Sequence, residues 1–288
     1  MEAITQYFVS GIFQGSIYAL IAVGIVVIFK ATRVFNFAQG HLLMIGVLLT
    51  YGFIGKFGIW ISIPLTIACG ICIGYLVERL MLRPLIGQSI VSALLMTLAV
   101  AYFLDGVATI FWGTKILPYP RWYPEQFFPF GPIKVSSGVV WSILIASMVF
   151  VALAFFYRRS RMGKVMRATA DSHQVSQSLG IKVTRIFSLC WIMATVIGFI
   201  MSFFFGVHVG AFRYLSDWGF RAIPAVLVGG LDSIRGAIIG GLLVGILEVI
   251  ATGYLGAFIG NMFPFIILLI VIIFRPHGLF GEVEIVRV

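Results

Sequence analysis

The sequence has little charge for its length. Only 10% of its 288 residues are Asp, Glu, Lys or Arg, whereas soluble domains carry about a quarter. Hydrophobic residues make up 61% of the chain, and the mean hydropathy is +1.09. This composition excludes an ordinary soluble domain and indicates a protein that lies in a membrane.

Cysteine is scarce, and the motifs of common catalytic sites are absent. Cys69 and Cys72 have CxxC spacing but lie inside an apolar run, which favours small packing residues over a disulfide or a metal site. The four histidines form no HExxH motif, and neither GxSxG nor the nucleotide-binding GxxxxGK[ST] occurs. We therefore expect no enzyme activity, no catalytic residue and no metal site in this chain.

Long apolar runs recur along the chain and define the fold class. They lie at residues 12–29, 58–77, 90–112, 137–157, 186–209, 236–253 and 259–274. A helix crosses the hydrocarbon core in about 20 residues, and no run alternates with period two as a membrane β-barrel would. The sequence predicts an all-α polytopic membrane protein with about eight transmembrane segments, one or two of them short or broken. Glu2 and the long first run favour a retained helix over a signal peptide.

The positive charge is unevenly distributed and predicts the orientation in the membrane. The net charge is +10, and residues 158–185 include seven Lys or Arg against Asp171 as the only acid. Such a loop stays in the cytoplasm. Counting spans from it places 30–33 and 78–89 inside, 113–136 outside, the N-terminus outside and the C-terminus in the cytoplasm. Because the same rule accounts for most of the basic excess, we expect no nucleic-acid partner.

The inward loop at 158–185 contains the signals of a short helix. Asp171 and Gln174 have the spacing of a capping box, and Gly180 is well placed to end the helix. Val175 and Leu179 lie on one side of it, four residues apart. The helix either inserts this apolar side into a groove of a soluble partner or is a solvated loop helix without such a role.

Two other segments have distinct compositions. The outward loop at 113–136 is rich in proline and aromatic residues, which suits either an irregular interfacial loop or a docking surface. Further on, the glycine pairs 236/240 and 241/245 predict a close approach of membrane helices. The ten or so residues at 222–231 are too few for a full span. We expect a short or broken helix there that ends near Gly229 and Gly230.

Several motifs occur in the order typical of one family. They read YALIAVGIVVIFKATRVFNFAQGHLLMIG, VERLMLRPL, MRATADSHQVSQSLGI, AVLVGGLDSIRGAIIGGLLVGILE and IIFRPHGLFG. The chain resembles, over essentially its whole length, the permease subunits of branched-chain amino acid ABC importers, and among them the shorter of two paralogues. That family also includes permeases for urea, short amides and other small organic solutes.

The resemblance implies a single transmembrane permease domain over 1–288, in a bacterial cytoplasmic membrane. It implies a second permease subunit, a paralogue, two ATP-binding subunits and a periplasmic or extracellular substrate-binding protein. ATP and Mg²⁺ would be used by the ATP-binding subunits, not by this chain. The short helix falls at the family's coupling segment, which assigns ATPase coupling to Arg167, Asp171, Gln174, Val175, Leu179 and Gly180.

Polar residues inside apolar runs are candidates for the translocation path, because hydrocarbon does not solvate them. The candidates are Asn36, Phe37, Gln39, Gly40, His41, Asp105 and Glu248. On a helix, Asn36 and Gln39 would share a face, and they either line the path or only hold helix packing. The family often has an acid at the position of His41 and an amide at that of Asp105. Arg213, Asp217 and Arg221 are candidate docking positions for the binding protein.

Three other functions are open at this point. A permease for urea or short amides, or for another small organic solute, fits the same family motifs. A secondary transporter would use Asp105 and Glu248 for ion coupling but needs no cytoplasmic docking helix. A sugar ABC permease has a related architecture and is distinguished by the NFAQG and RPHG motifs.

Overall fold

The computed structural model describes residues 2–130, 133–171 and 173–281. Within these ranges the chain forms helices and one two-stranded hairpin, and seven helices are long and apolar enough to cross a membrane. The predicted all-α polytopic class is confirmed. Length and apolar composition were the decisive signals, because a backbone in hydrocarbon must satisfy its hydrogen bonds within each segment.

The elements follow the predicted runs closely. They are α1 Glu2–Thr32, α2 Gln39–Leu76, the π-helical η1 Val77–Leu82, the 3₁₀ turn η2 Arg83–Leu85, α3 Ile90–Trp112, β1 Phe127–Phe130, β2 Ile133–Ser136, α4 Ser137–Arg159, α5 Arg161–Asp171, α6 His173–Ser178, α7 Val183–Val209, the 3₁₀ turn η3 Arg213–Ser216, α8 Asp217–Arg221, α9 Ile223–Gly229, α10 Ile234–Leu255 and α11 Ala257–Phe274.

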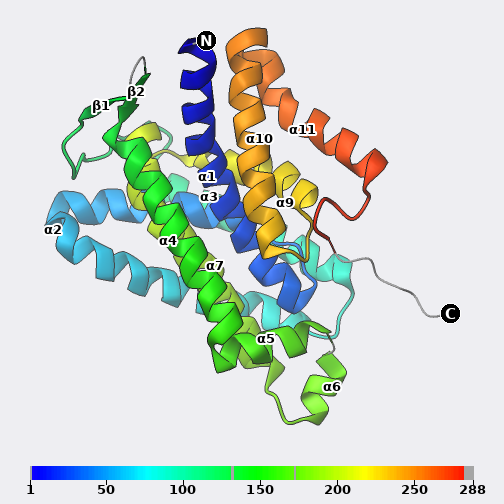
Figure 1. Ribbon diagram of the computed structural model, residues 1–288. Coiled ribbons are helices and arrows are strands. Elements are labelled where there is room, and N and C mark those ends of the chain that lie inside the picture. The colour runs from blue at the N-terminus through cyan, green and yellow to red at the C-terminus, as the bar shows by residue number, and fades with distance from the viewer. Residues whose placement is uncertain (1, 131–132, 172, 282–288) are drawn as a thin grey trace.

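Helix α2 is broken in the middle, so that it supplies two of the predicted segments. Gly58 has φ 71° and ψ 174°, a backbone conformation that L-residues with a side chain rarely adopt. Figure 1 shows the two arms of α2 as a V whose tip lies at one side of the molecule. The apolar run that the sequence predicts from residue 58 onward is the second arm. The expectation of about eight segments, one or two of them short or broken, therefore agrees with seven long helices among the described residues, of which α2 is bent into two arms.

The connections gather at two ends of the molecule. At the hairpin end, the backbone at Leu117 pairs with Ala211, and the ring of Tyr7 lies edge-on against that of Tyr254. At the α5 end, Arg33 forms an ion pair with Asp232 at 2.7 Å. These contacts join the segments that the charge pattern assigns to the same side.

Glycines bring α10 against α1 and α9. A Cβ on Gly241 or Gly245 would collide with the α1 backbone at Ala19 and Gly15, and Gly236 approaches the Gly229 backbone in the same way. The predicted close helix contacts at both glycine pairs are confirmed. Such contacts stabilise membrane helices through van der Waals packing, since lipid provides little hydrophobic drive for association.

The short segment before α10 ends where the sequence predicts. Helix α9 has Pro224 in its first turn and stops at Gly230, which has φ 105°. The backbone N–H groups of Leu279 and Phe280 donate to the carbonyls of Val228 and Gly229. The segment after α11 thus satisfies carbonyls at the end of α9 that have no partner within the helix.

Two connections hold more structure than the sequence analysis predicted. The outward loop was predicted to be irregular, but Phe127–Phe130 and Ile133–Ser136 form an antiparallel hairpin. In the inward loop only α6 was expected, yet α5 precedes it and buries Met166 and Thr169 against the helices above. The many basic residues of α5 hid its one apolar side, because they lower the mean hydropathy of the segment.

Candidate functional site

The polar stretch at residues 34–41 begins with a non-helical segment inside the protein. Helix α1 ends at Thr32 and α2 starts at Gln39, so Asn36 does not lie on a helix as the shared-face argument assumed. Its Oδ1 accepts the Ala38 N–H at 3.0 Å, and Thr97 of α3 bonds the Phe37 N–H and the Phe35 carbonyl, both at 3.3 Å. Side chains from two elements thus replace the missing helical hydrogen bonds, as irregular backbone at membrane depth requires.

Gln39 connects this segment to α7. Asn36 Nδ2 donates to Gln39 Oε1 at 3.1 Å, and Gln39 Nε2 donates to the Ala194 carbonyl at 3.1 Å. Both side chains are buried, and Gly24 of α1 lies so close that a Cβ there would collide with Gln39. These contacts agree with the packing alternative for Asn36 and Gln39, whose role in lining the path stays a prediction.

The first turn of α2 also crosses α8, at Gly40, with almost no space between the backbones. A Cβ on Gly40 would collide with the Ser216 carbonyl oxygen and with Gly219. His41 follows, 6% exposed, with its ring edge-on to Phe220 at a centroid distance of 6.4 Å. Its Nδ1 is buried and has no hydrogen-bond partner among the described residues. A buried polar atom of this kind is uncommon and marks a place to look for function.

Asp105 forms an ion pair that the sequence analysis did not predict. Arg213 Nη2 donates to Asp105 Oδ2 at 2.5 Å, and the two side chains are 28% and 21% exposed, respectively. Asp105 lies about 10 Å along the axis from the end of α3 at Trp112. Arg213 Nε is buried and has no partner among the described residues.

These groups form one cluster at the hairpin-end half of the molecule. We call it the α3–α8 cluster, and it comprises His41, Asp105, Arg213 and Asp217. The charges of Asp105 and Asp217 both act on His41. Two members were predicted to line the path and two to form a docking surface, and the structure brings all four together.

Glu248 lies apart from this cluster. It is buried in α10 beside Tyr18 and Gln14 of α1, both of which interact with its carboxyl group. Gln14 Nε2 in turn donates to the Tyr18 hydroxyl at 3.2 Å. Glu248 Oε2 has no hydrogen-bond partner among the described residues. The neighbours of Glu248 therefore come from the α1–α10 contact, and the charge of Arg221 in α8 also acts on its carboxyl group.

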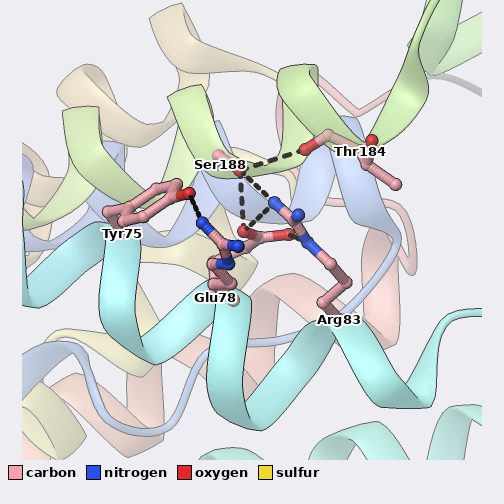
Figure 2. A network of polar contacts seen from close by, with 6 residues as sticks. Tyr75, Glu78, Arg83, Thr184 and Ser188 are labelled. Carbon is pink, nitrogen blue, oxygen red and sulfur yellow. Dashed lines mark hydrogen bonds and ion pairs between the residues drawn. The ribbon is translucent and has the colours of Figure 1, made fainter.

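A second polar group lies at the α5 end, shown in Figure 2, and we call it the α2–α7 network. Its members are Glu78, Arg83 and Ser188. Arg83 binds the Glu78 carboxylate through Nε at 3.1 Å and Nη2 at 2.8 Å. The Ser188 hydroxyl donates to Glu78 at 2.7 Å and accepts from Arg83 at 2.8 Å. Glu78 and Arg83 belong to the motif VERLMLRPL, for which no partner was predicted. Their contact with Ser188 was not foreseen because Ser188 lies more than 100 positions further along the chain.

The predicted coupling segment lies beyond this network. Val175 of α6 is 59% exposed and Leu179 is 73% exposed, while Gly180 ends the helix with φ 79°. Arg167 of α5 donates to the Tyr157 carbonyl of α4, which fastens α5 to the membrane helix. The side chains of Asp171 and Gln174, predicted to form the capping box, lie outside the described residues.

The chain is similar to known proteins over nearly its whole length. The family model described as "Branched-chain amino acid transport system / permease component" matches residues 7–273. The chain belongs to this family. The permease is 30% identical over 305 residues to the "High-affinity branched-chain amino acid transport system permease protein LivH" of Escherichia coli K12, covering 98% of this chain and 97% of that one.

Two further relatives define how wide the similarity is. The BraD permease protein of the high-affinity branched-chain amino acid transport system of Pseudomonas aeruginosa is 28% identical, again over 98% of this permease and 97% of that chain. The "Ribose import permease protein RbsC" of Escherichia coli K12 is 24% identical over 82% of this permease and 74% of that chain. No solved structure matches this permease.

Proposed function

We propose that this chain is the membrane-spanning permease subunit of an ATP-driven importer for branched-chain or other small amino acids. The observation that carries the proposal is the end-to-end similarity to LivH, which covers 98% of the chain. ATP hydrolysis, with its Mg²⁺, belongs to two separate ATP-binding subunits. A second permease, a paralogue, completes the path, and a substrate-binding protein delivers the solute.

The orientation follows from the distribution of charge. The α5 end carries the basic loop at 158–185 and faces the cytoplasm, where basic loops are retained. The hairpin end then faces outward toward the binding protein, with the N-terminus outside and the C-terminus inside. Ion pairing of Arg33 with Asp232 supports this arrangement, because both belong to segments that the charge pattern places inside.

The translocation path follows the α3–α8 cluster. A charged pair at membrane depth is costly unless it faces water, a cavity or a partner. Asp105, Arg213 and His41 offer charged or unpaired groups there, and Phe37 and Gly40 lie on the adjoining stretch. Asn36 and Gln39 support the start of α2, and Glu248 is a further path candidate from α10.

The test is uptake by the complex reconstituted in lipid vesicles with its partner subunits and binding protein. Leucine, isoleucine and valine are compared with urea, short amides and ribose, and ATP hydrolysis is recorded in parallel. We expect ATP-dependent uptake of the aliphatic amino acids only. Uptake of urea or an amide alone would instead support the alternative solute class, and uptake driven by an ion gradient without ATP would make the chain a secondary transporter.

Coupling to the ATP-binding subunits is assigned to α6. Val175 and Leu179 expose apolar side chains at the end that faces the cytoplasm in this proposal. Replacing both (Val175→Asp with Leu179→Asp) places two charges on the docking side, where unpaired buried charge is strongly unfavourable. We expect uptake to fall to background while the two permeases still co-purify. Normal uptake by this variant would remove the coupling role from α6.

A further inference from the structure

The Asp105–Arg213 pair has the charge pattern of an amino acid head group. A free amino acid carries an ammonium and a carboxylate on one carbon, and moving it through a membrane requires a partner for each charge. Asp105 is the matching partner for an ammonium, and Arg213 is the matching partner for a carboxylate. The two side chains come from separate elements, α3 and η3, and are both partly exposed.

We propose that this ion pair is the head-group subsite of the translocation path, and that it opens to exchange partners with a zwitterionic α-amino acid. This inference rests on the proposed function and names the residues that bind the charged groups of the substrate. In the closed state seen here, the two side chains satisfy each other. During transport the substrate ammonium binds Asp105 and its carboxylate binds Arg213, so neither protein charge is left unpaired.

Arg213 has spare capacity for this exchange. It meets Asp105 through Nη2, while its Nε is buried with no partner among the described residues. A guanidinium can bind a carboxylate through two parallel N–H groups, so a substrate carboxylate could use donors that Asp105 leaves free. The guanidinium also lies over the Tyr214 ring at 5.4 Å, which holds its plane while the partner changes.

His41 supplies a third contact. The residue is 6% exposed, its Nδ1 has no partner among the described residues, and the charge of Asp105 acts on the imidazole. Its position is fixed by the tight crossing of Gly40 over Gly219 and by the edge-on contact with Phe220. A nitrogen held in this way can bond a head group that has displaced the closed pair.

The test replaces the pair by an uncharged pair of similar shape (Asp105→Asn with Arg213→Gln). Leucine uptake is measured with saturating, loaded binding protein, together with docking affinity and ATP hydrolysis. We expect uptake to fall about tenfold or more, since hydrogen bonds to charged groups each contribute about a factor of ten. Docking and binding-protein-stimulated ATP hydrolysis should be retained, so that more ATP is used per leucine.

The Arg33–Asp232 pair provides a matched control. It also joins two segments distant in the sequence, at 2.7 Å, and its side chains are 40% and 20% exposed. It lies at the α5 end and away from the proposed subsite. Neutralising it (Arg33→Gln with Asp232→Asn) should leave the KM for loaded binding protein and the ATP used per leucine unchanged.

Three results would overturn the inference. One is unchanged uptake by the uncharged pair. Another is a loss of docking affinity that matches the loss of uptake, which would assign the pair to the binding-protein surface. The third is full recovery of uptake on exchanging the two charges (Asp105→Arg with Arg213→Asp), because a merely structural pair survives such an exchange. If the wild-type complex transports no amino acid, the proposed function fails instead.

A conservative variant keeps the test decisive if the uncharged pair does not assemble. Asp105→Glu with Arg213→Lys retains both charges but changes their reach and removes the planar guanidinium. We expect an assembled complex with a several-fold higher ratio of ATP used to leucine transported. Wild-type coupling in this variant would contradict the inference.

Discussion

The α2–α7 network and the α3–α8 cluster are each built around an ion pair. They differ in how many of their polar side-chain atoms have a hydrogen-bond partner. In the network the Glu78 carboxylate, 1% exposed, accepts from Arg83 and Ser188. In the cluster Asp105 and Arg213 are partly exposed, and buried nitrogens of Arg213 and His41 have no partner among the described residues.

This difference separates a structural group from a candidate site. A buried polar network stabilises one arrangement when each member is satisfied, and removing a member is costly. A cluster whose hydrogen-bond donors lack partners can bind another molecule through them. Its own contacts contribute less to stability than those of a fully hydrogen-bonded network. The network also lies where η1 and η2, which continue α2, meet the start of α7, and α7 in turn contacts α5 and α6 of the proposed coupling segment.

The largest expected effect comes from breaking the network at its charge. Arg83→Ala leaves the buried Glu78 carboxylate with the Ser188 hydroxyl alone. We expect the free energy of unfolding to fall by about 2–3 kcal/mol, less than the ~3–5 kcal/mol of a fully buried pair because Arg83 is a third exposed. Denaturation in detergent micelles, followed by circular dichroism, measures it.

The matched change in the cluster is Arg213→Ala, for which we expect a loss of about 0–1 kcal/mol, as for partly solvated pairs. Equal losses at the two arginines would contradict the distinction between network and cluster. A second comparison isolates the unpaired charge. Replacing both Glu78 and Arg83 by Met removes the buried carboxylate as well and should recover more than half of the loss.

A smaller effect is expected from the neutral member of the network. Ser188→Ala removes the hydroxyl that links Glu78 to Arg83, without leaving a charge unpaired. The free energy of unfolding should fall by about 1–1.5 kcal/mol. The control is Ser142→Ala, whose hydroxyl donates to the Gly138 carbonyl of its own helix. A loss at Ser188 no larger than that at Ser142 would mean that the network gains little from its third member.

The sequence predicted the elements of the fold much better than their contacts. Apolar length identified the long helices, and the shortness of 222–231 with Gly229 and Gly230 at its end identified the short α9, because these signals lie within each segment. Helix α5 was missed because its apolar side is narrow and its charges dominate the average. The strands Phe127–Phe130 and Ile133–Ser136 were missed because a segment so rich in aromatic and proline residues resembles an interfacial loop.

For the candidate site, the sequence identified the residues but not their partners. Asp105 and His41 were singled out because ionisable groups in apolar runs are costly. Nothing in a single sequence connects Asp105 with Arg213, 108 positions away, or Glu78 with Ser188, 110 positions away. Asn36 was misplaced on a helix, because the side-chain hydrogen bonds that end α1 and start α2 depend on Thr97 of another segment.

The smallest effect on stability is expected at His41. His41→Phe keeps a ring for the edge-on contact with Phe220 and removes the unpartnered Nδ1. Exchanging a buried, unsatisfied polar atom for an apolar one of similar shape is close to neutral, so the free energy of unfolding should change by less than about 0.5 kcal/mol. Leucine uptake should nevertheless fall, since the nitrogen serves the substrate in the proposed path.

The neighbouring Gln39 provides the contrast. Gln39→Leu breaks the hydrogen bonds to Asn36 and to the Ala194 carbonyl, and it leaves Asn36 Nδ2 buried. We expect this variant to lose about 1–3 kcal/mol, the cost of an unsatisfied buried group. Two residues only two positions apart in α2 would then have opposite signatures, stability at Gln39 and transport at His41. A large loss of stability in His41→Phe would place His41 with the supporting residues and leave the Asp105–Arg213 pair as the substrate-reading part of the cluster.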